Sequence, residues 1–278
     1  MDFPWRKPPL SRPLRLILAS DSHDDRGLLD TFVDVANRAS PDAVVMAGDF
    51  QSYGTPKEWR TVDAGWAALK SPLLAVPGNH DHRRASLPHF QHLYGQVPRG
   101  VDLAGCHLVL IDDGAYHLGD QLDFLERDLA AHAGRRTIVI AHVPLDLPWR
   151  LSYLNLLDWL PSLHHDDPHA PDHLTLPEPD RSRLLAILQR YHVDALVTGH
   201  LHSYGIESLP GGIPSLHVGT VGGYLTEFGE PHSYLAATIT DQGIELGRRA
   251  LDTAPPTPWA LIQSWQHYQR TARSIKGP

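Results

Sequence analysis

Histidine and acidic side chains recur at five places along the chain, each directly after a short apolar run. The five motifs are Asp21-Ser22-His23, Gly48-Asp49, Gly78-Asn79-His80-Asp81, His142 and Gly199-His200-Leu201-His202. Imidazole nitrogens and carboxylate oxygens are common protein ligands of zinc and of other first-row transition metals. The chain also holds 19 histidines, an unusually large number for 278 residues. These motifs predict a metal-dependent chemistry.

The number of candidate ligands indicates how many ions the site would hold. Without His80, the motifs offer Asp21, His23, Asp49, Asn79, His142, His200 and His202. Seven side chains are too many for one tetrahedral zinc and suit two ions that each keep an open position. Asp49 has two carboxylate oxygens and can bridge both ions. Residues two apart in extended backbone, such as His200 and His202, point to opposite sides and can serve different ions.

The elements before these motifs read as an α/β protein, because short apolar runs alternate with stretches of helical periodicity. Strands are predicted at residues 14–19, 43–47, 73–76, 107–111, 137–141 and 195–198, and helices at 27–39, 57–69, 121–132 and 181–191. In open α/β sheets, ligands bind at the carboxyl ends of the parallel strands. We therefore expect the five motifs to meet at one sheet edge.

The rest of the chain departs from this alternation. Glycine- and proline-bounded β segments at 204–209, 215–221, 234–240 and 244–251 predict a second sheet or a mixed extension of the first. A helix is predicted at 257–273. Residues 145–180 are rich in proline and read as an insertion into a single domain that spans residues 1–278. The apolar residues of this insertion are expected to pack internally, with a lid over the site or a dimer contact as the alternatives.

Composition narrows the possible partners and the location. A formal net charge of −8 without a long basic run disfavours a surface that tracks nucleic acid, although nucleic acid is not excluded. No apolar signal segment or membrane-length run is present, so we expect no membrane association and a cytoplasmic location. Cys106 lies in an apolar run and is expected to be a buried thiol. His82 is expected to face solvent, and His217 to be structural.

In order and spacing, the five motifs resemble those of the calcineurin-like metallophosphoesterases, which read D-x-H, G-D, G-N-H-[DE], H and G-H-x-H. The resemblance covers residues 14 to about 205 and is closest to the cyclic-nucleotide phosphodiesterase branch. It implies a two-sheet β sandwich flanked by helices, in four α/β/β/α layers. It also implies that Asp21, His23, Asp49 and His202 hold one ion and that Asp49, Asn79, His142 and His200 hold the other.

The resemblance also implies a mechanism. Two divalent ions less two carboxylates leave about two net positive charges, which complement a phosphoester and its transition state. A hydroxide that bridges the ions would attack phosphorus. His80 would hydrogen-bond a phosphoryl oxygen or protonate the leaving group, and Asp81 would fix the loop or the imidazole. Manganese is the expected metal, with iron or zinc as alternatives.

One position departs from the family pattern. Many relatives place an aspartate three residues after the Gly-Asp aspartate to orient the loop histidine, whereas this chain has Ser52. The protein-phosphatase signature G-D-x-x-D-R-G is therefore missing, which favours a small phosphodiester such as a cyclic nucleotide. A phosphomonoesterase or a nuclease on the same site, or a non-catalytic scaffold, are the alternatives. A nuclease should show a basic groove, and a scaffold should have lost ligands that this chain keeps.

Overall fold

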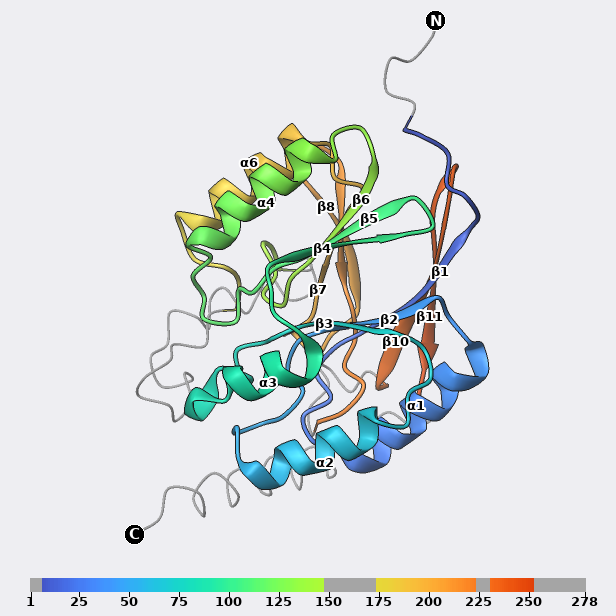
Figure 1. Cartoon of the computed structure of the whole chain (residues 1–278), viewed down its shortest axis with the longest axis vertical. Helices are drawn as coiled ribbons and strands as arrows, with labels where there is room; N and C mark the ends of the chain where they lie inside the picture. The colour runs from blue at the N-terminus through green and yellow to red at the C-terminus, as the bar shows by residue number, and fades with distance from the viewer. Residues whose placement is uncertain (1–6, 148–173, 224–230, 253–278) are drawn as a thin grey trace, which may run out of the picture.

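The strands that precede the motifs are almost entirely apolar because both of their faces are buried. In β1 (Leu14–Ala19), Leu14, Leu16 and Leu18 pack between two sheets, whereas Ile17 and Ala19 pack against helices. A computed structural model describes this arrangement for residues 7–147, 174–223 and 231–252. Two sheets stack face to face with helices on both outer faces, which confirms the predicted α/β/β/α fold (Figure 1).

The first sheet combines the start and the end of the described chain. Its order is β11-β10-β1-β2-β3, with β2 at Ala43–Ala47, β3 at Leu73–Val76, β10 at Ser233–Thr240 and β11 at Gly243–Ala250. β1, β2 and β3 run parallel, and β10 pairs antiparallel with β1. β10 and β11 therefore extend the first sheet and do not belong to a separate one.

The second sheet contains the central strands. Its order is β4-β5-β6-β7-β9-β8, formed by Arg99–Leu103, Cys106–Leu110, Arg136–Ile140, Ala195–Thr198, Ile213–His217 and Gly205–Leu209 respectively. β5, β6, β7 and β9 are parallel, and β4 and β8 are antiparallel to their neighbours. The β segments that follow residue 203 are thus shared between the two sheets. Cys106 is fully buried in β5, as expected.

Each sheet has its own helices. α1 (Arg26–Ala39), α2 (Pro56–Trp66) and α3 (Leu87–Tyr94) contribute side chains to the core on the outer face of the first sheet. α4 (Asp120–Ala131) and α6 (Asp180–Arg190) cover the second sheet, and the two groups lie on opposite sides of the molecule (Figure 1). α2 begins with a capping box formed by Thr55 and Glu58.

Several sequence predictions fall on residues that the structure does not describe. The helix predicted at 257–273 and most of the 145–180 insertion, from 148 to 173, lie outside the described residues. The single-domain organisation and the lid or dimer role of the insertion stay predictions. Within the described ranges, no helix has the length and apolar character needed to cross a membrane.

Candidate metal centre

The five motifs occupy the loops at the carboxyl ends of strands from both sheets. Asp21 and His23 follow β1, Asp49 follows β2, Asn79 and His80 follow β3, His142 follows β6, and His200 and His202 follow β7. The expectation of a single sheet edge was therefore incomplete. Because the two sheets lie face to face, the loops of β1 to β3 and those of β6 and β7 can approach one another from opposite sides of the sandwich.

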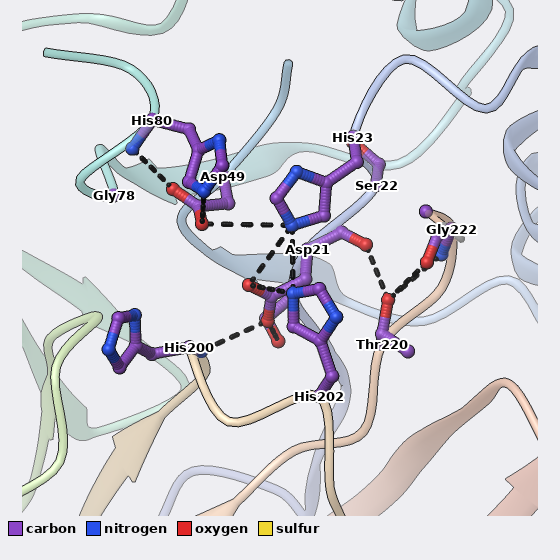
Figure 2. Close-up of polar contacts among 12 residues, drawn as sticks. Asp21, Ser22, His23, Asp49, Gly78, His80, His200, His202, Thr220 and Gly222 are labelled. Carbon is purple, nitrogen blue, oxygen red and sulfur yellow. Dashed lines mark hydrogen bonds and ion pairs between the residues drawn. The ribbon is translucent and has the colours of Figure 1, made fainter. Parts of the chain in front are cut away.

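The first group of side chains contains Asp21, His23 and His202. Asp21 Oδ1 lies 3.7 Å from His23 Nε2 and 3.4 Å from His202 Nε2, and the two Nε2 atoms are 2.8 Å apart (Figure 2). Asp21 Oδ2 accepts a hydrogen bond from the backbone N–H of His200 at 3.1 Å. Asp21 Oδ1 is buried and has no hydrogen-bond partner within the described part of the chain.

The second group contains Asp49, Asn79, His142 and His200. His142 Nε2 lies 3.3 Å from Asp49 Oδ2. Asn79 Oδ1 lies 3.1 Å from His142 Nε2 and 3.1 Å from His200 Nδ1. The structure thus brings all seven predicted ligands into two adjacent groups.

Asp49 lies between these groups. Its Oδ2 atom is 3.7 Å from His23 Nε2 in the first group (Figure 2) and 3.3 Å from His142 Nε2 in the second. Its Oδ1 atom accepts the backbone N–H of His80 at 2.9 Å. This position fits a carboxylate that is shared by two ions.

Three observations show that these residues fit a pair of metal ions. The donor set of imidazoles, carboxylates and one amide oxygen suits manganese, iron or zinc. Asp21 Oδ1 is buried without a hydrogen-bond partner among the described residues, and it lies near the Nε2 atoms of His23 and His202. This arrangement is unfavourable unless a cation lies between these atoms. The backbone is also strained at the ligands: φ is positive at Asp21, His23, Asp49, His200 and His202, with values of 56°, 44°, 57°, 71° and 50°.

Close packing of glycines permits this geometry. Gly48 has φ +91°, and a Cβ there would overlap the imidazole ring of His142. A Cβ on Gly78 would overlap the carboxylate of Asp49. The two glycines therefore let the β2 and β3 loops approach the ligands of the centre.

Contacts behind the ligands orient them. His142 Nδ1 donates to the carbonyl of Ala47 at 2.7 Å, which leaves Nε2 directed at the centre. The buried Asp113 carboxylate accepts the backbone N–H groups of His142 and Val143 at 2.8 and 3.0 Å. Thr220 Oγ1 donates to the carbonyl of Asp21 at 2.6 Å (Figure 2). Asp113 was missed by the sequence analysis, although it too follows an apolar strand.

The charges of the protein alone indicate that the centre attracts cations. Burial opposes protonation of His142, but the carboxylates of Asp49, Asp21 and Asp113 outweigh it and raise its pKa to about 10. Burial likewise opposes ionisation of Asp49, yet the surrounding imidazoles hold its pKa well below the ordinary value. The carboxylates of Asp21 and Asp49 therefore remain ionised, and in the absence of metal they draw a proton onto the imidazole of His142.

His80 lies beside the centre and is held by a backbone carbonyl. Its Nδ1 atom is 2.6 Å from the carbonyl oxygen of Ser52, so Nδ1 carries the proton. Its Nε2 atom is 3.8 Å from Asp49 Oδ2. Burial, followed by the positive charge of Arg83, holds the pKa of His80 well below its ordinary value.

The side chain of Ser52 does not take the place of the family's aspartate, because its hydroxyl donates to Asp24 Oδ1 at 2.7 Å. A main-chain oxygen therefore contacts His80 where many relatives use a carboxylate.

Asp81 supports the loops and is fully buried. Its carboxylate accepts the backbone N–H groups of Gly78, Asp49 and Phe50 at 2.9, 3.0 and 3.1 Å. These bonds join the loop after β2 to the loop after β3. The contacts agree with the loop-fixing role considered for Asp81.

The two other histidines singled out in the sequence have structural partners. His82 is half-buried, and its Nε2 atom lies 2.8 Å from Asp112 Oδ1, so it does not simply face solvent as expected. His217 is fully buried between Thr198 Oγ1 and Ser215 Oγ, at 3.2 and 3.4 Å, in line with a structural role.

Three curated proteins with similar sequences are named as phosphodiesterases. A probable cyclic nucleotide phosphodiesterase of Rhodococcus erythropolis is 29% identical over 65% of this chain and 57% of its own length. A cAMP/cGMP dual specificity phosphodiesterase of Mycobacterium tuberculosis is 29% identical over 72% of this chain and 60% of its own length. The glycerophosphodiester phosphodiesterase GpdQ of Enterobacter lignolyticus is 38% identical, but over only 34% of this chain and 32% of that protein. The chain thus spans less than two thirds of these relatives.

Solved structures share the fold at low sequence identity. A dimetal phosphatase from Danio rerio superimposes with a TM-score of 0.65 at 15% identity, over 88% of this chain and 98% of that one. The purple acid phosphatase PPD1 from Lupinus luteus gives 0.64 at 16% identity, over 88% and 53% of the two chains. The sequence profile of the calcineurin-like phosphoesterases matches residues 14–204, from β1 to just beyond His202. The chain belongs to the calcineurin-like phosphoesterase family.

Proposed function

We propose that this protein is a two-metal phosphodiesterase that hydrolyses a small phosphodiester, with a cyclic nucleotide as the first candidate. The observation that carries the proposal is the position of Asp49 Oδ2, within 3.7 Å of an imidazole from each ligand group. One carboxylate shared between two sets of ligands is what a two-metal site requires.

The residues that would hold the ions follow from the two groups. Asp21, His23 and His202 would hold the first ion, Asn79, His142 and His200 the second, and Asp49 both. Such ions, when bound, polarise the phosphoester and lower the pKa of coordinated water toward neutrality. The protein supplies two carboxylates against four imidazoles and an amide oxygen, so it leaves about half of the positive charge of two divalent ions available to the substrate.

His80 is proposed to act on the substrate directly. Since Nδ1–H is directed at the Ser52 carbonyl, the neutral ring presents an unprotonated Nε2 toward the centre. Nε2 must take up a proton before it can donate a hydrogen bond to a phosphoryl oxygen or protonate a leaving alkoxide. The negative charge of a bound phosphodiester favours that protonation. Asp81 is proposed as a positioning residue, because its carboxylate holds the backbone of both loops around His80.

The preference for a diester rests on the relatives and on Ser52. Two matched relatives are named as cyclic nucleotide phosphodiesterases, and one as a glycerophosphodiester phosphodiesterase. The protein-phosphatase aspartate is absent at position 52. Manganese is the proposed metal, and the cytoplasmic location stays a prediction.

The proposal is tested by a substrate screen on metal-loaded protein. The purified chain is loaded with Mn²⁺, Fe²⁺ or Zn²⁺ and assayed with a cyclic nucleotide, an acyclic diester and a monoester that carries the same leaving group. We expect the diesters to be hydrolysed faster than the monoester, with metal analysis showing two ions per chain. Faster hydrolysis of the monoester would contradict the substrate class, and inactivity toward every ester with every metal would contradict the activity itself.

A further inference from the structure

The loop after β2 and the loop after β3 are joined by two side chains beside His80. Gln51 Nε2, in the first loop, donates to the backbone carbonyl of His80 in the second. In the opposite direction, Arg83 Nη1 donates to the carbonyl of Ser52 at 3.1 Å. Both interactions flank the imidazole that the proposed function places against the substrate.

The Ser52 carbonyl oxygen therefore has two donors. His80 Nδ1 approaches it at 2.6 Å and Arg83 Nη1 at 3.1 Å. A carbonyl oxygen has two lone pairs and can accept both hydrogen bonds. We propose that Arg83 is a positioning residue for His80 that acts through this shared carbonyl oxygen. The inference rests on the proposed function, because it concerns how His80 is aimed.

The surroundings explain why the carbonyl needs a second donor. Gly54 stands two residues after Ser52 and has φ +72°, a backbone conformation that glycine adopts more readily than other residues. The Ser52 hydroxyl is bound to Asp24 and does not hold the carbonyl. Arg83 contacts this segment in two further ways: its guanidinium carbon lies 6.0 Å from the centre of the Tyr53 ring, and its own carbonyl packs against Gly54.

The chemistry of arginine suits this role. A guanidinium stays protonated at every physiological pH, so it is a permanent donor. A charged donor also makes a stronger hydrogen bond than a neutral one. With Arg83 in place, the peptide between residues 52 and 53 keeps its carbonyl aimed at His80 Nδ1, and the ring keeps Nε2 aimed at the centre.

The first test measures turnover of the metal-loaded protein with a diester. We expect Arg83→Met to lower kcat by about tenfold and to change KM by less than about twofold, because misaimed groups lose rate and not ground-state binding. Arg84→Met is the matched control, because Arg84 is the exposed neighbour, and it should leave both constants unchanged. Unchanged metal content and circular dichroism show that the Arg83 variant is folded.

The second test asks whether Arg83 acts through His80. In a His80→Ala background, Arg83→Met should change kcat by less than about twofold, because residues that act as a unit are not additive. The same tenfold loss in both backgrounds would overturn the proposal, and so would a rise in KM with kcat unchanged, since that would make Arg83 a substrate-binding residue.

A third test does not depend on activity. Histidine ¹⁵N spectra of the protein, with the His80 signal assigned by comparison with His80→Ala, report which ring nitrogen carries the proton. We expect the Nδ1–H tautomer in the original chain and a shifted or mixed signal in Arg83→Met. An identical His80 signal in both proteins would contradict the inference. If the protein hydrolyses no phosphoester, the proposed function fails, and this spectrum alone still decides the role of Arg83.

Discussion

Asp49 faces imidazoles from both ligand groups of the centre. Its two oxygens face His142, His23 and the backbone N–H of His80, and its own backbone N–H is held by Asp81. A neutral amide would keep the shape of this side chain but would offer only one oxygen and no charge. The centre depends on the carboxylate at this position more than on any individual imidazole.

Asp49→Asn should lose metal as well as activity. We expect bound metal to fall from two ions to one or none per chain, and turnover to fall at least about a thousandfold, as when a principal electrostatic group is removed. Elemental analysis of the dialysed protein and a diester assay measure both. The exposed Asp120→Asn serves as the control. Two ions retained in Asp49→Asn would show that Asp49 does not bridge.

His80→Ala should separate chemistry from metal binding. Since His80 contacts the substrate in the proposed mechanism and is not among the ligands, metal content should stay at two ions. Turnover should fall by about two to four orders of magnitude, the range for loss of a general acid or a transition-state hydrogen bond. Metal analysis and kcat on the same preparation check this, and unchanged turnover would remove His80 from the mechanism.

At the scale of elements, the centre is built by loops that leave two different sheets. Strand ends supply its ligands, and the loops approach closely because Gly48 and Gly78 have no side chain. The tail strands matter as well: β10 pairs with β1 from Leu14↔Ile239 to Leu18↔Leu235, directly before Asp21. The position of the first ligand therefore depends on residues more than two hundred positions away.

Gly48→Ala should damage both stability and metal binding. The new methyl group overlaps the His142 ring, and alanine at φ +91° is strained, so we expect a loss of about 2–4 kcal/mol from the free energy of unfolding. Gly134→Ala is the matched control, because Gly134 also has a positive φ, +82°, but a Cβ there meets no atom within 4 Å. Urea denaturation and metal titration of both variants provide the test. Equal losses in the two variants would rule out the His142 overlap as the cause.

Leu235→Ala should weaken the whole first sheet. Leu235 is fully buried between the two sheets, and its truncation should lower the free energy of unfolding by about 2–5 kcal/mol. Gln242→Ala, in the exposed turn before β11, is the control. Urea midpoints of the two variants measure the difference. A midpoint for Leu235→Ala equal to that of the control would mean that β10 is not part of the cooperative core.

At the scale of the whole molecule, the ligands tie both sheets together. Four of the seven, Asp21, His23, Asp49 and Asn79, follow strands of the first sheet, and His142, His200 and His202 follow strands of the second. Bound ions would therefore cross-link the two halves of the sandwich. Metal binding and folding stability should be coupled.

Removal of metal should lower the melting temperature. A single site filled at one hundred times its Kd adds about 2.7 kcal/mol, which corresponds to a rise of about 5 °C for a chain of this size. Melting curves in EDTA and in excess Mn²⁺ measure the shift, and Asp49→Asn should show a smaller one. Identical curves for the original chain in both buffers would contradict the cross-linking role.

The sequence predicted those parts of the molecule whose signal is local. The strands Leu14–Ala19, Ala43–Ala47, Leu73–Val76 and Ala195–Thr198 begin and end where expected, because burial makes them almost entirely apolar, with Arg15 and Thr198 as the exceptions. β4, Arg99–Leu103, was missed because its positions are only half-buried or exposed and it holds charged residues and a glycine. α3 is short and carries a proline, so its periodicity is weak.

The site shows the same division. Its candidate ligands could be predicted because each one follows a strand. The contacts of the Ser52 carbonyl with His80 and of the Thr220 hydroxyl with Asp21 could not be predicted. Each joins residues that are far apart in the sequence, and only the folded backbone brings them together. The sequence showed that the family's aspartate was missing at position 52, but not that a main-chain oxygen would contact His80 there.

The order in which the ligands appear along the chain has a consequence for synthesis on the ribosome. Asp21 emerges 181 residues before His202 and 199 residues before the supporting Thr220. Before then, Asp21 lacks its neighbour His202, and β1 gains its β10 partner only later still. A nascent chain therefore cannot complete the proposed ligand set before His202 has been translated.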